Sequence, residues 1–148
     1  MNINTRLINF GRNKQNMNQN RNNDLALLIL RVVFGGAMLY GHGLGKLMRL
    51  FSGEEIKFFN FLNLGPEVSL TLVVFAEFLC AILIVLGLFT RWATLPLIFA
   101  MLVAIFGAHF GDPFGKIEKA LLFLAAYAAL FMTGAGSYSI DGLLKKRR

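Results

Sequence analysis

The chain has 148 residues, of which 56% are hydrophobic and only 16% are charged, and its mean hydropathy is +0.60. The length suggests one domain, but this composition excludes an ordinary soluble domain and makes a membrane protein the class to consider. The net charge of +7 does not indicate a nucleic-acid-binding protein, because the sequence contains no basic and aromatic recognition module.

The first 24 residues contain nine Asn and two Gln and have almost no apolar periodicity. Such a composition predicts a disordered N-terminal tail over residues 1–24. A cleaved signal peptide fits poorly, because the first apolar run carries Arg31 and no small-residue cleavage site follows it. At the other end, residues 145–148 form a basic C-terminal tail.

Four apolar stretches follow the N-terminal tail, at residues 25–44, 68–89, 92–110 and 117–133. A helix needs about 17 to 25 residues to cross a hydrocarbon core of roughly 30 Å, and each stretch is long enough. The stretches are continuously apolar rather than alternating, which favours helices over the strands of a membrane barrel. The sequence therefore predicts an all-α, multi-pass membrane protein, with a four-transmembrane-helix bundle over residues 25–144.

The connection between the first two stretches, "MRLFSGEEIKFFNFLNLGP", mixes aromatic with charged residues. This mixture predicts an interfacial segment between helices 1 and 2, with a short amphipathic helix as one form that it could take. Pro66 then restarts a helix, since proline is tolerated in a first turn. By the same argument, Asp112 is predicted to be an N-cap and Pro113 the first residue of a helix.

Positive residues are distributed unequally between the two sides of the predicted membrane. With four spans, both termini and Arg91 share one side, which carries nine Lys and Arg residues against five on the other side. Because positive flanking residues stay in the cytoplasm, both termini are predicted to be cytoplasmic.

Two charged residues lie inside predicted spans, Arg31 in the first and Glu77 in the second. Charges at this depth are costly and normally find partners inside the bundle, so we expect Arg31 to pair with Glu77. Such a pair could be structural or could face a substrate, and the sequence leaves this open. On an ideal helix, Arg31, His42 and Arg49 share one face.

Further ionisable residues meet at the predicted non-cytoplasmic mouth of the bundle. They are His42, Lys46, His109, Asp112 and Glu118. Imidazoles, carboxylates and cations at the border of an apolar cavity suit ligand binding and proton transfer, although solvated loop charges are the alternative. No tight ligand motif such as HExxH is present, so no metal site is predicted.

Three stretches in this order resemble the DoxX family of small bacterial and archaeal membrane proteins. They are "LRVVFGGAMLYGHGLGKL", "AEFLCAILIVLGLFTRWA" and "GDPFGKIEKALLFLAAYAALFMTGAGSYSIDGLL". The resemblance implies a four-helix bundle in the bacterial plasma (inner) membrane and an association with redox chemistry, since the family name comes from a subunit of thiosulfate:quinone oxidoreductase. The recurrent polar positions of the family correspond to Arg31, His42, Lys46, Glu77, Arg91, Asp112 and Glu118.

The leading hypothesis is therefore a quinone-interacting oxidoreductase subunit linked to sulfur, thiol or oxidative-stress chemistry. Its expected catalytic residues, which would handle protons, are Glu77, His109 and Asp112. Its expected substrate-binding residues are Arg31, His42, Lys46 and Glu118. Membrane lipid and a redox partner protein are the expected partners, and a homo-oligomer is considered. The alternatives are a non-enzymatic binder or transporter of a lipid or small hydrophobic molecule, and a membrane scaffold for a soluble partner.

Overall fold

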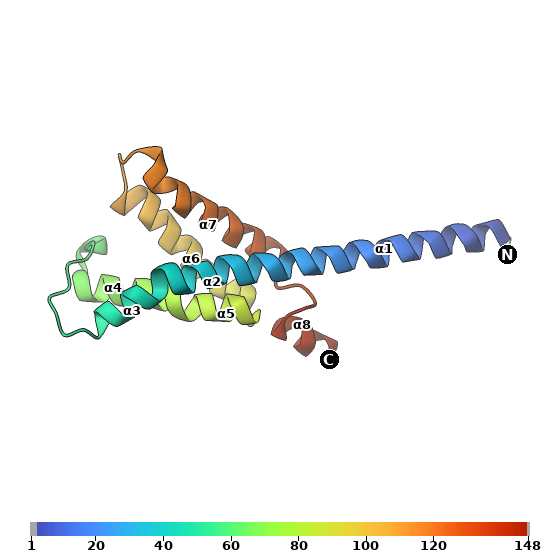
Figure 1. The fold of residues 1–148 in the computed structure, drawn as a ribbon, viewed down its shortest axis with the longest axis horizontal. Helices are drawn as coiled ribbons and strands as arrows, with labels where there is room; N and C mark the ends of the chain where they lie inside the picture. Colours follow the sequence, from blue (N-terminus) through green and yellow to red (C-terminus); the bar gives the residue numbers. More distant parts are fainter. Residues whose placement is uncertain (1–2, 148) are drawn as a thin grey trace.

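The computed structural model describes residues 3–147, with side chains described for residues 17–147. Every regular element in this range is a helix, which confirms the predicted all-α class. Figure 1 shows the long helices gathered into a bundle, from which the N-terminal part of the first helix projects.

The first helical rod is continuous from residue 3 to residue 50. It consists of α1 (Ile3–Leu30), the π-helical turn η1 (Arg31–Gly35), α2 (Gly36–Met38), a second π-helical turn η2 (Leu39–Gly43) and α3 (Leu44–Leu50). The sequence predicts a disordered tail over residues 1–24, whereas the described backbone is helical from residue 3. All side chains of residues 17–23 are exposed, so packing against the bundle does not stabilise this part of α1.

The two π-helical turns change which residues of the rod face the bundle. Buried positions follow helical spacing from Arg31 through Gly35 to Met38, but the next buried position is Gly43, five residues later. Each π turn adds one residue to a helical turn and rotates the downstream residues by about 100°. The prediction that Arg49 shares a face with Arg31 is therefore wrong, since Arg49 is exposed.

The connection after α3 is mostly irregular. Its one regular element is the 3₁₀ turn η3 (Phe61–Asn63), so the connection forms no amphipathic helix. Arg49 Nη2 donates a hydrogen bond to the Lys57 carbonyl (2.6 Å) and holds the middle of the connection to the end of α3.

The second rod consists of α4 (Pro66–Val74), the π-helical segment η4 (Phe75–Cys80) and α5 (Ala81–Leu86). Pro66 is its first residue, as predicted. Two glycines of the first rod bring it against this helix. A Cβ on Gly35 would lie 3.3 Å from the Ala81 carbonyl oxygen, and one on Gly43 would lie 2.3 Å from that of Glu77. These two contacts set the register of the helix pair.

The remaining helices are α6 (Thr90–Val103), the π-helical turn η5 (Ala104–Ala108), α7 (Phe114–Thr133) and the short α8 (Ile140–Lys146). Asp112 does not cap α7 as predicted. The helix begins at Phe114 without a side-chain cap, because the Asp112 carboxylate accepts from His109 instead. α6 and α7 pack together, and their loop lies at the same end of the bundle as α3 and α4 (Figure 1).

Three of the described helices are long and apolar enough to cross a membrane: Met17–Leu50, Pro66–Leu86 and Thr90–Ala108. α7 has 20 residues, but three charged side chains, Lys116, Glu118 and Lys119, lie within its first six residues. Its remaining turns contribute Tyr127 and Leu130 to the core of the bundle. The chain is therefore a multi-pass helical membrane protein.

Candidate functional site

The second rod carries one buried carboxylate, Glu77, in η4. Lys46 of α3 reaches across the helix interface and forms a hydrogen bond and an ion pair with Glu77 Oε2. The Glu77 side chain is 7% exposed and the Lys46 side chain 26% exposed, so the pair lies inside the bundle and is accessible from the lysine. The prediction that Arg31 pairs with Glu77 is wrong.

The helix register explains why Arg31 pairs elsewhere. Gly35 contacts Ala81, so Arg31, one turn earlier in the antiparallel rod, is level with Val85. Val85 and Glu77 are eight residues apart, which is about 12 Å along a helix. A guanidinium level with Val85 therefore meets the end of the second rod, whereas Lys46 is positioned to meet Glu77.

Arg31 is 1% exposed, and its hydrogen-bond acceptors are backbone carbonyls. Its guanidinium donates to the carbonyls of Ile84 (3.5 Å), Val85 (3.2 Å) and Tyr138. The neighbouring Gly87 has φ +66°, and a Cβ there would lie 2.3 Å from Arg31 Nη1. Arg31 thus joins the first rod to the end of the second rod and to the C-terminal segment.

Asp141 adds a second set of hydrogen bonds between the C-terminal segment and the helices, and sequence reasoning missed it. Its carboxylate accepts hydrogen bonds from the amides of Phe89 and Thr90, both at 2.9 Å, at the start of α6. Its own amide donates to the Gly87 carbonyl at 2.9 Å. Asp141 caps a helix that begins 51 residues earlier in the chain, so local sequence patterns around α6 give no signal for it.

His42 of η2 lies near the Lys46–Glu77 pair. Its ring packs edge-on against Phe123 of α7, with a centroid distance of 5.7 Å. In the first rod, His42 lies one helical turn before Lys46. Behind Phe123, the fully buried Tyr127 donates its hydroxyl to the Phe34 carbonyl (3.3 Å). We call His42, Lys46 and Glu77 the central cluster.

Four of the seven predicted site residues lie in or directly after a π-helical turn. Arg31 is in η1, His42 in η2 and Glu77 in η4, while His109 directly follows η5. π turns are rare, and they occur frequently at functional sites. Sequence periodicity does not reveal them, because it assumes a constant 3.6 residues per turn.

The predicted residues of the α6–α7 loop form a separate group. His109 Nδ1 lies 3.0 Å from Asp112 Oδ2, and Lys116 donates to Asp112 Oδ1 at 3.3 Å. The hydrogen bond with His109, supported by Lys116, holds the pKa of Asp112 below its usual value. Glu118 is exposed and makes no ion pair within the described part of the chain. The hydrogen bonds of this group do not reach the central cluster.

A groove of about 240 Å³ lies between the irregular connection, α4, η4 and α6. Its walls include Phe58, Phe59 and Phe61 from the connection, and Ala76 and Phe99 from the helices. The hydroxyl of Ser69, its one polar lining side chain, is occupied by the Gly65 carbonyl and the Phe61 amide. The groove is thus an apolar site, and Ala76 lines it from the residue next to Glu77.

The described residues contain no group of three His, Cys, Asp or Glu side chains that could hold a metal ion. Cys80 is a free thiol buried in the core between the helices.

The family model DoxX matches residues 26–110, more than half of the chain. The chain belongs to the DoxX family. No curated protein and no solved structure that we compared matches it. The DoxX match covers the central cluster, Arg31 and His109, and it ends before Asp112 and Glu118.

Proposed function

We propose that this DoxX protein is a quinone-interacting subunit of a membrane oxidoreductase, with the central cluster as its ligand-binding and proton-exchange site. The observation that carries the proposal is the Lys46–Glu77 ion pair inside a membrane bundle. Ionisable residues at this depth are costly, and they commonly mark substrate sites and proton relays.

The donors of the central cluster suit a quinone head group. A quinone carbonyl needs hydrogen-bond donors, which Lys46 Nζ and the His42 ring supply. Lys46 is the partly exposed member of the pair, so a ligand approaching it does not have to separate the two rods at Gly43. Glu77, already in contact with Lys46, is placed to hold or release a proton.

A bound quinone would accept two electrons and two protons to become a quinol. In this proposal the electrons come from outside the chain, from a reduced sulfur compound or a redox partner protein. The role of this chain is to bind the ligand and move protons. We assign the proton exchange next to the ligand to Glu77. We propose that His109 and Asp112 exchange protons with the aqueous side at the α6–α7 loop, where they form a separate group with no direct hydrogen bond to Glu77. Arg31 positions the helices, and Glu118 remains a surface residue of the same mouth.

The membrane arrangement is part of the proposal. We propose that α7 forms a fourth span, with its three charged residues at the membrane surface and the rest of the helix packed on α6. Four spans place both termini on one side, and the excess of Lys and Arg there assigns that side to the cytoplasm of a bacterial inner membrane.

Binding of a short-chain quinone to the full chain in nanodiscs tests this function. We expect saturable binding by the wild type and at least tenfold weaker binding by Glu77→Gln, because the substitution removes the charged partner that holds Lys46 Nζ in place for the quinone carbonyl. Glu118→Gln is the matched control, because it removes an exposed carboxylate. Equal affinity for all three proteins would contradict the proposal.

The apolar groove favours a second function, binding or transport of a lipid or small hydrophobic molecule without redox turnover. Its lining offers dispersion contacts and no free hydrogen-bond donor, so it suits a hydrocarbon group. Ala76→Phe would fill the groove from the position next to Glu77. Loss of a bound hydrophobic molecule in Ala76→Phe, with normal retention in Glu77→Gln, would favour this second function.

A further inference from the structure

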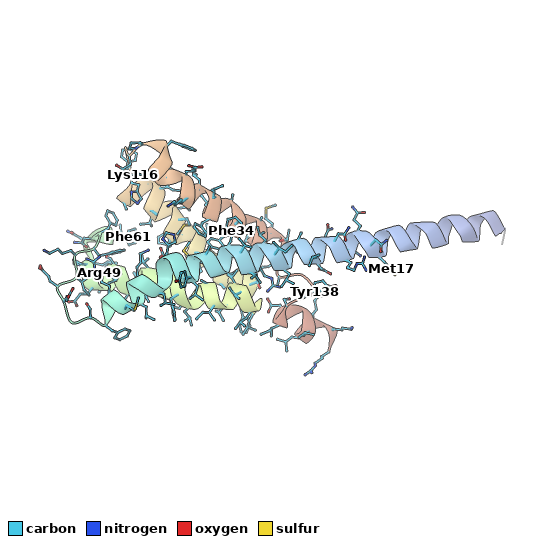
Figure 2. The ribbon with its side chains drawn as sticks, viewed as in Figure 1. Met17, Phe34, Arg49, Phe61, Lys116 and Tyr138 are labelled. Atoms are coloured by element: carbon cyan, nitrogen blue, oxygen red, sulfur yellow. The ribbon has the colours of Figure 1, made fainter. Side chains whose placement is uncertain are left out.

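A second cavity lies at the opposite end of the bundle from the central cluster's mouth. It has a volume of about 380 Å³ and lies between α1 and the segment that leads into α8. It is lined by Arg21, Asn22, Leu25, Leu28 and Tyr138. Figure 2 shows Tyr138 beside α1 at the point where the C-terminal segment passes it. We call this cavity the terminal pocket.

The wall that carries Tyr138 is fixed in place. The Ser137 amide donates to Asp24 Oδ1 of α1 at 2.9 Å, and the Tyr138 carbonyl accepts from the buried Arg31. Gly136 lies so close to α1 that a Cβ on it would be 3.3 Å from Leu27. The terminal pocket is therefore built by hydrogen bonds and close packing on both sides of Tyr138.

The lining of the terminal pocket changes character along α1. Arg21 and Asn22 lie at its outer end, and Leu25 and Leu28 lie one and two turns closer to the bundle. From Arg21 to Leu28 is about 10 Å along the helix. Cationic and amide donors followed by leucines match a phosphate group followed by the first part of a hydrocarbon chain.

The charges around the terminal pocket favour an anion. Arg21 makes no ion pair with any residue that the structure describes. Both carboxylates near this end are occupied as acceptors, Asp24 by the Ser137 amide and Asp141 by the first amides of α6. The same end carries Lys145, Lys146 and Arg147 at the end of α8.

We propose that the terminal pocket binds an anionic membrane phospholipid, with the phosphate on Arg21 and the first methylene groups along Leu25 and Leu28. The site is independent of the proposed quinone chemistry, because it shares no residue with the central cluster. A bound lipid would join α1 to the C-terminal segment at the membrane surface.

Native mass spectrometry of the detergent-solubilised full chain, titrated with phosphatidylglycerol, tests the proposal. The comparison ligands are phosphatidylcholine with the same acyl chains and inorganic phosphate. We expect tighter binding of phosphatidylglycerol than of either, and a roughly tenfold loss of affinity in Arg21→Gln. Arg147→Gln is the matched control, since it removes the same charge from the same end outside the pocket, and we expect less than a twofold loss.

Three results would overturn the proposal. Equal losses in Arg21→Gln and Arg147→Gln would show general surface attraction rather than a site. Equal affinity for the two phospholipids would show that the head-group charge is not recognised. Competition by inorganic phosphate at concentrations similar to those of the lipid would show a free-anion site. Because Arg21 is exposed, its variant should keep the wild-type unfolding midpoint, which checks that the fold is intact.

Discussion

Arg31 and Glu77 are both buried charged residues, yet their partners differ in kind. Arg31 donates to three backbone carbonyls, which cannot change their protonation. Glu77 is paired with Lys46, an ionisable and partly exposed side chain. We therefore interpret Arg31 as a structural residue and Glu77 as the residue suited to chemistry, which the sequence alone left open.

Arg31→Met tests the structural interpretation. The substitution leaves the carbonyls of Val85 and Tyr138 without the Arg31 donor, while the Ile84 carbonyl keeps the Gly87 amide. We therefore expect a loss of roughly 2 to 4 kcal/mol in the free energy of unfolding. Arg49→Met removes one exposed hydrogen bond and should cost less than about 1 kcal/mol. Chemical unfolding in detergent measures both. Equal losses of unfolding free energy in the two variants would show that the buried hydrogen bonds of Arg31 add nothing to stability.

Asp112 gives a prediction for acidic pH. Its pKa is lowered by the hydrogen bond with His109, so its contribution to stability is present above the unfolded value of about 3.9 and is lost as the pH falls through the folded value. Carbon-13 NMR of labelled aspartate should give a midpoint below about 3.9 for Asp112. His109→Ala should raise this midpoint, and an unchanged midpoint would contradict the assigned cause.

At the scale of the helices, the contact between the first two rods depends on glycine. Gly35 and Gly43 are buried against the second rod, whereas a Cβ on Gly36, Gly41 or Gly45 would meet nothing within 4 Å. Gly43 lies directly on the backbone of Glu77, so the same contact positions the carboxylate for Lys46.

Gly43→Ala should therefore destabilise the protein. The added Cβ would lie 2.3 Å from the Glu77 carbonyl oxygen and must push the rods apart, at a cost of about 1 to 3 kcal/mol. Gly41→Ala adds the same methyl group to open space in the same π turn, and we expect no loss of stability. The unfolding midpoints of the two variants test this. A lower midpoint in Gly43→Ala alone indicates a packing clash, whereas equal changes in both variants would indicate an effect of helix propensity.

The sequence predicts the helices better than their relative rotation. The predicted stretches 68–89 and 92–110 correspond closely to the observed rods Pro66–Leu86 and Thr90–Ala108, because hydrophobic length determines them. The prediction that Arg31 and Arg49 share a face is wrong, since two π turns, which sequence periodicity does not reveal, rotate the rod between them. The ion-pair partner of Glu77 was missed because the glycine contacts, which set the register, appear only in three dimensions.

At the scale of the whole molecule, the polar residues divide among three regions. The central cluster lies within the bundle, and the His109–Asp112–Lys116 group lies at the α6–α7 loop and the start of α7. Arg31 and Asp141 connect the helices at the end of the bundle next to α8. Sequence reasoning placed His42, Lys46, His109 and Asp112 together at one mouth, because topology gives the end of the bundle but not the neighbours within it. The apolar groove was also missed, since an irregular connection forms one wall.

Cysteine labelling tests the proposed four-span topology. In a Cys80→Ala background, Ser52→Cys should react with an impermeant maleimide in intact cells, while Asn18→Cys and Lys145→Cys should react only after lysis. Four spans place the last two positions on the same side of the membrane. Labelling of Asn18→Cys and Lys145→Cys from opposite sides would show that α7 does not cross.

Redox-induced infrared difference spectroscopy, on the full chain in quinone-loaded nanodiscs, tests the role of the central cluster most directly. If Glu77 exchanges a proton when the quinone is reduced, the wild type should show a carboxyl band that is absent in Glu77→Gln and kept in Glu118→Gln. A wild-type spectrum without a carboxyl change, or the same band in Glu77→Gln, would contradict the proposed function.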